Sequence, residues 1–110
     1  MSKHKAKPQK ESLVVQGILQ WAGYKPGLLL WKSRGGTVQL RTGNWVNFGP
    51  KGLPDLVGMY RGRFIGCECK TAKGKQSDVQ KEFQEKVEKH GGIYVLARSV
   101  ADLEAALEAE

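Results

Sequence analysis

The sequence predicts a single α/β domain in which helices flank a mixed β-sheet on both faces. Its 110 residues are enough for one hydrophobic core but not for two. The expected order of elements is helix, short strands, β-hairpin, helix, strand, helix, which mixes both structure types along the chain. The hairpin is apolar on both faces, whereas a solvated sheet face would carry more polar residues. We therefore expect helices on both sides of the sheet.

The N-terminal residues divide into a basic arm and a first helix. Residues 1–10 contain four lysines and no large apolar residue after the first, so we expect a flexible arm, serving either as a solubilising tail or as a phosphate contact. The folded domain then covers residues 11–110. A helix is expected from about Pro8 to Ala22, and Gly23 ends it. Its apolar stripe consists of Val14, Val15, Ile18 and Trp21.

Two short strands and a long loop are expected next. Residues 28–32 and 37–41 have strand composition, while residues 42–52 are rich in Gly, Asn and Pro. A loop this long in a small domain favours a functional role. Its aromatic residues Trp45 and Phe48 either cap the edge of the core or stack on bases or sugars. The basic residues expected to meet phosphates here are Arg34, Arg41 and Lys51.

Residues 53–70 are expected to form a β-hairpin. Two runs rich in large apolar residues flank Arg61-Gly62, and Gly supplies the positive φ of a two-residue turn. Partners across such a hairpin lie at equal distances from the turn. Asp55 therefore faces Glu68.

Two opposed carboxylates indicate a site for a divalent cation. Opposed Cβ atoms lie about 4.5–5.5 Å apart, where like charges repel, and Mg²⁺ is often held by one or two carboxylates. Strand alternation places Lys70 on the same face as Glu68 and turns Cys67 and Cys69 to the other face. These thiols are expected to be buried and reduced, because zinc needs about four ligands and the two histidines lie far away in sequence.

The rest of the chain is expected to contain a loop, two helices and a strand. Residues 71–76 read as a mobile basic loop, residues 77–90 as a helix and residues 93–97 as an apolar strand. Ser99 opens a last helix. The loop lysines expected either to guide a nucleic-acid backbone or to be solvated surface charges are Lys73 and Lys75.

Composition limits the partners. Lys and Arg number 18 against 11 Asp and Glu, which gives a net charge of +7. This excess favours a polyanion, with nucleic acid preferred over an anionic membrane. No apolar run approaches the roughly 18–20 residues of a membrane span, and no signal peptide is evident. We therefore expect no membrane partner and a cytoplasmic location.

The motif Pro54-Asp55 followed after a hairpin by Glu68-Cys69-Lys70 resembles that of the PD-(D/E)XK nucleases. From about Glu11 to about Leu107, the chain resembles the VRR-NUC branch, in particular its small stand-alone members of phage and bacterial type. The features that carry this resemblance are Glu11, Arg41-Thr42-Gly43, Lys51-Gly52-x-Pro54-Asp55, Phe64-Ile65-x-Cys67-Glu68-Cys69-Lys70-Thr71, Ser77-x-x-Gln80 and Gly91-Gly92-x-Tyr94-Val95.

The resemblance implies a restriction-endonuclease-like core and a metal site. It implies that Asp55, Glu68 and the backbone carbonyl of Cys69 bind Mg²⁺ or Mn²⁺. Glu11 would act through a water or at a second metal position, although an acid in a first turn equally suits the helix dipole. Lys70 would orient or help deprotonate the attacking water.

Gln80 has two interpretations. The resemblance implies that it helps to hold the attacking water or the substrate backbone. Ser77-x-x-Gln80 also has the form of a capping box, which is a purely structural use.

The implied activity is metal-dependent endonucleolytic cleavage of DNA. The small members of the branch suggest a homodimer acting on branched substrates such as Holliday junctions, because two symmetric cuts call for two sites related by a two-fold axis. The alternatives are a basic nucleic-acid-binding domain that keeps the fold without turnover and a nuclease directed to RNA.

Overall fold

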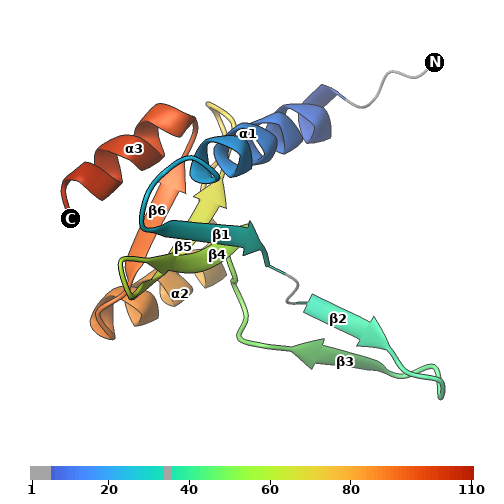
Figure 1. Ribbon diagram of the computed structural model, residues 1–110. Helices are drawn as coiled ribbons and strands as arrows, with labels where there is room; N and C mark the ends of the chain where they lie inside the picture. Colours follow the sequence, from blue (N-terminus) through green and yellow to red (C-terminus); the bar gives the residue numbers. More distant parts are fainter. Residues whose placement is uncertain (1–5, 34–35) are drawn as a thin grey trace.

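The computed structural model describes residues 6–33 and 36–110, and the expected α/β domain with a mixed sheet and flanking helices is confirmed (Figure 1). Lys3, Lys5 and Arg34 lie outside the described residues. The elements are α1 (Ala6–Ala22), β1 (Leu28–Lys32), β2 (Gly36–Gln39), β3 (Trp45–Phe48), β4 (Leu56–Tyr60), β5 (Arg63–Cys69), α2 (Asp78–Lys89), β6 (Ile93–Ala97) and α3 (Val100–Glu108).

The main sheet has four strands in the order β1-β4-β5-β6. Strand β4 pairs antiparallel with both β1 and β5, and β6 runs parallel to β5. A parallel pair needs a crossover connection, and α2 supplies it. In Figure 1, α1 and α3 lie together on one side of the sheet and α2 lies on the other.

The core lies between the sheet and the helices α1 and α3. Ile18 of α1, Leu103 and Leu107 of α3 are fully or almost fully buried against it. Cys67 and Cys69 of β5 are fully buried in the same cluster and form no disulfide. This confirms the expectation of buried, reduced thiols that face away from Glu68. Alternate residues of one strand therefore serve the core on one face and polar groups on the other.

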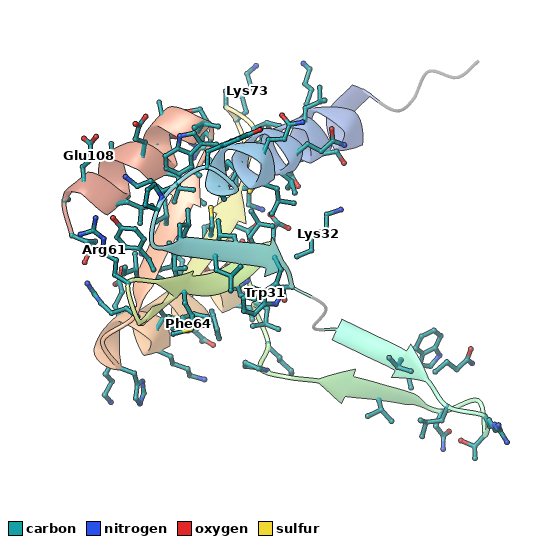
Figure 2. All side chains as sticks on the ribbon, in the orientation of Figure 1. Trp31, Lys32, Arg61, Phe64, Lys73 and Glu108 are labelled. Carbon is teal, nitrogen blue, oxygen red and sulfur yellow. The ribbon has the colours of Figure 1, made fainter. Side chains whose placement is uncertain are left out.

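Helices lie on both sides of the sheet as expected, but the face opposite α1 and α3 is covered only in part. Helix α2 packs against β6, at one edge of the sheet. The β1–β4–β5 side presents a row of apolar residues that are between 40% and 61% exposed. This row consists of Leu29, Trp31, Met59 and Phe64; Trp31 and Phe64 are labelled in Figure 2.

The expected long loop over residues 42–52 is incorrect, because part of it is a strand. Residues 45–48 form β3, which pairs antiparallel with β2 in a separate two-stranded ribbon. The ribbon tip, residues 40–44, is closed by backbone bonds from Leu40 N to the Asn44 oxygen and from Gly43 N to the Leu40 oxygen. Gly43 has φ 93°, the left-handed conformation that such a short connection demands.

The first helix begins at Ala6, earlier than expected, so residues 6–10 of the expected basic arm are helical. None of the helices in the described part of the chain is long and apolar enough to cross a membrane.

Candidate active site

The β4–β5 hairpin brings Asp55 and Glu68 together, as its register predicts. Arg61 and Gly62 form the turn with φ of 49° and 87°, which matches the positive values of a type I′ turn. The strand pairing runs to Leu56 opposite Cys67. One step further, Asp55 and Glu68 lie opposite each other, and the Asp55 backbone N–H donates to the Glu68 carboxylate.

Two hydrogen bonds fix the carboxylates relative to the backbone. The Asp55 N–H donates to Glu68 Oε1 at 3.2 Å, and the Cys69 N–H donates to Asp55 Oδ2 at 2.9 Å. Each carboxylate therefore accepts a hydrogen bond from the backbone of the segment that carries the other acid. Because one oxygen of each carboxylate is held in this way, the orientation of both side chains is set before any ligand arrives.

Glu68 is the buried charged residue of this pair. Only 3% of it is exposed, and Lys70 Nζ lies 3.3 Å from its Oε2. Burial, followed by the charge of Asp55, raises the pKa of Glu68 from 4.5 to about 7, although the Lys70 ammonium acts in the opposite direction. The positive charge of one lysine therefore does not neutralise the negative charge of two acids, and a further positive charge near the pair would be stabilising.

Lys70 is held in place by its backbone and by the loop that follows it. Its N–H donates to the Ala97 oxygen at the end of β6. A Cβ atom at Gly74 would lie 3.2 Å from two carbon atoms of the Lys70 side chain, so the loop folds back onto that side chain. The absence of a side chain at Gly74 permits this close approach.

Arg98 is a residue of this site that the sequence did not reveal. Its guanidinium group donates to the backbone oxygens of Thr71, Ala72 and Gly74, and its own N–H donates to Asp102 Oδ2. The loop expected to be mobile is therefore braced from the end of β6. No local pattern marks an arginine that acts across 24 to 27 residues of sequence.

Glu11 lies near this braced loop rather than in a group with the two acids. It lines a pocket of about 580 Å³ with Lys10 and residues 71–74, Lys73 among them. In Figure 2, the Lys73 side chain lies above α1 in this view. Among residues 6–33 and 36–110, no three His, Cys, Asp or Glu side chains are grouped to hold a metal. The structure thus brings two acids together, Asp55 and Glu68, while Glu11 lines the separate pocket beside residues 71–74.

A second pocket opens at Asp55. Its volume is about 370 Å³, and it lies between α1 and the two segments that lead into and out of the ribbon. The residues that line it are Ser12, Val15, Gln16, Lys32, Ser33, Leu53, Pro54 and Asp55. This pocket gives a ligand access to Asp55 from the α1 side of the sheet edge.

Gln80 forms the capping box that its spacing predicts. Its Oε1 accepts from the Ser77 N–H at 2.9 Å, and the Gln80 N–H donates to Ser77 Oγ at 3.2 Å. The structural use of Gln80 is therefore present. A role in holding water or substrate stays a prediction.

The other basic residues are spread over several parts of the surface. Lys73 and Lys75 are exposed in the braced loop, Arg41 is exposed at the ribbon tip and Lys51 is exposed where the chain returns from the ribbon. Trp45 is 65% exposed on the ribbon, so it does not cap the edge of the core. The structure brings the acids and Lys70 together and leaves the phosphate-contact candidates dispersed around them.

A carboxylate pair of this kind suits a hard divalent cation. Asp55 and Glu68 supply oxygen ligands at one place, and the carbonyl of Cys69 belongs to the residue whose N–H holds Asp55. The raised pKa of Glu68 is the expected property of such a pair without a cation. Comparison of the chain with protein-family models found no match, and neither did comparison with curated proteins.

Proposed function

We propose that the chain is a metal-dependent DNA endonuclease with a PD-(D/E)XK core of the VRR-NUC type. The single observation that carries the proposal is the Asp55–Glu68 pair, in which Glu68 is buried and Asp55 half-buried, with Lys70 Nζ 3.3 Å from Glu68. A domain that only binds nucleic acid gains nothing from two adjacent acids, because their negative charge repels the phosphates of the ligand. A phosphodiesterase needs such a pair to concentrate positive charge at the scissile phosphate.

The proposed reaction is hydrolysis of a phosphodiester. The oxygen of a water molecule bonds to phosphorus, the bond from phosphorus to the leaving sugar oxygen breaks, and that oxygen takes up a proton. A bound Mg²⁺ or Mn²⁺ would polarise the scissile phosphate and make water a better nucleophile near neutral pH. Asp55, Glu68 and the Cys69 carbonyl would hold this ion.

The remaining roles follow from position. Lys70 carries a positive charge beside Glu68, where it can orient the attacking water and stabilise negative charge on the phosphate. The exposed lysines of the braced loop, Lys73 and Lys75, would steer the backbone of the substrate towards the acids. Glu11, on the wall beside that loop, would act through water.

The proposal includes a homodimer and branched DNA as substrate. One such site cuts one strand, so paired symmetric cuts need two copies related by a two-fold axis. The net charge of +7 supports a nucleic-acid partner.

The test is a cleavage assay on labelled four-way junction, flap, nicked and linear duplex DNA, and on RNA of the same sequence. Each substrate is incubated with Mg²⁺, Mn²⁺ or EDTA. Glu68→Gln is the inactivating variant, and Glu85→Gln, at an exposed position of α2, is the matched control. Metal-dependent cutting by the wild type and the control, but not by Glu68→Gln, is expected.

Binding without cutting under every metal would refute the nuclease and favour the non-catalytic binding domain. Stronger cutting of RNA than of DNA would replace the substrate but keep the site. Cutting at full rate by Glu68→Gln would remove the carboxylate pair from the chemistry.

A further inference from the structure

The β2–β3 ribbon projects from the body and lacks the packing that normally stabilises a hairpin. Figure 1 shows it extending away from the sheet and helices, and the extensive contacts of β2 and β3 are with each other. A two-stranded hairpin is marginally stable on its own in water. This one also exposes Val38, Leu40 and Trp45 by 45% to 65%. We therefore expect a binding partner to cover part of this ribbon.

The positive charge of the ribbon and its base indicates which kind of partner binds there. Between Glu11 and Asp55 the sequence contains no acidic residue, whereas it contains five Lys or Arg residues. In the described part, Arg41 is exposed at the tip, and Lys32 and Lys51 are exposed at the base of the ribbon. A second copy of the chain would bring two basic surfaces together, whereas a polyanion complements them.

The ribbon starts and ends beside the candidate active site. The Ser33 N–H donates to the Asp55 oxygen at 2.9 Å, and both connecting segments line the pocket at Asp55. Extended chain spans at most about 3.3–3.6 Å per residue, so the tip lies within about 30 Å of this base. This reach corresponds to about nine nucleotides of a stacked strand. DNA placed at the acids therefore runs within range of the ribbon.

We propose that the ribbon is the arm that selects the substrate, with Trp45 stacking on a base that is not held in a duplex and Arg41 contacting the phosphates beside it. The indole needs an accessible base face, and in a duplex both faces of each base are covered by its neighbours. The substrate class is therefore DNA with unpaired or splayed bases, such as a branch point. This inference rests on the proposed nuclease function and names the substrate of the same site.

The experiment measures binding without cleavage. Fluorescence anisotropy in EDTA follows the wild type, Trp45→Ala and Trp45→Phe on three labelled probes: a four-way junction, a single strand and a linear duplex. Trp31→Ala is the matched control, because it removes an exposed tryptophan from β1 and leaves the ribbon intact. Circular dichroism and thermal unfolding establish that each variant is folded.

Trp45→Ala should weaken junction and single-strand binding by about fivefold to a hundredfold, the range that stacking of one base supplies. Duplex affinity should change less than twofold, Trp45→Phe should retain most of the affinity, and Trp31→Ala should match the wild type. Arg41→Ala should weaken binding to all three probes and reduce the salt dependence by about one released ion.

Equal losses on junction and duplex after Trp45→Ala would overturn the inference, because they would indicate groove binding. Unchanged affinity would overturn it as well, as would a shift from dimer to monomer in light scattering, which would make the ribbon a contact between copies. Because the binding is measured in EDTA, selective loss together with absent cutting would sink the nuclease proposal alone. Normal cutting without any binding effect would sink the ribbon inference alone.

Discussion

Replacing Glu68 by Gln should make the stability of the metal-free protein less dependent on pH. The pKa of Glu68 is raised from 4.5 to about 7 by burial and by Asp55. Between these two values the folded protein binds more protons at this residue than the unfolded chain, so the free energy of unfolding falls as pH rises. This loss of stability is complete at pH values above the pKa of Glu68 in the folded protein. Glutamine stays neutral and removes this contribution.

The size of the effect follows from the pKa difference. A shift from 4.5 to about 7 corresponds to about 3.5 kcal/mol at about 1.4 kcal/mol per unit. Little solvent screening reduces it, since Glu68 is almost fully buried. Part of this loss occurs below pH 5, so between pH 5 and pH 8 the free energy of unfolding should fall by about 2.5 kcal/mol more in the wild type than in Glu68→Gln.

Urea unfolding in EDTA at pH 5, 6, 7 and 8 measures this difference. Comparing the two proteins at each pH cancels the titration of other groups. Glu85→Gln, which removes an exposed acid of α2, should follow the wild-type curve. Parallel curves for wild type and Glu68→Gln would refute the raised pKa, and with it the claim that the pair lacks sufficient positive charge.

Three further variants test the surroundings of the acids. Lys70→Ala should lower the cutting rate at least tenfold while Mn²⁺ still stabilises the protein against urea; an unchanged rate would remove Lys70 from the chemistry. Arg98→Ala should release the three carbonyl bonds to the 71–74 loop, and hydrogen exchange there should rise while exchange in β4 stays constant. Gln80→Ala should cost about 1 kcal/mol through the lost cap, and a rate decrease not restored by lower temperature would add a role at the site.

The acid pair could be predicted from the sequence because its geometry is local. Arg61-Gly62 specifies a two-residue turn with positive φ, and this turn fixes the register that places Asp55 opposite Glu68. Period-two alternation then separates the buried thiols from the acids. The same reasoning works for the capping box of α2, since both of its residues lie within one helical turn.

Other features depend on contacts between distant segments. The bonds from Arg98 to the 71–74 loop have no local signature. The apolar residues of β1 and β4 predict burial, but the packing of α2 at the β6 edge leaves them exposed. The second strand of the ribbon was not predicted, because its four residues are flanked by Gly and Asn, which are typical of loops. Gly43, which has a positive φ, is the local residue that could have indicated a short hairpin connection.

The ribbon leaves the body and returns to it at neighbouring points. Ser33 and Asp55 are joined by a backbone hydrogen bond, so a much shorter connection could close the same gap. The entropic cost of a loop grows only slowly with its length, and exposed insertions of this kind tolerate change in length. Insertions and deletions between residues 36 and 48 are therefore compatible with an undisturbed acid pair. In such an architecture, the length and sequence of the ribbon can change while the arrangement of Asp55 and Glu68 stays the same.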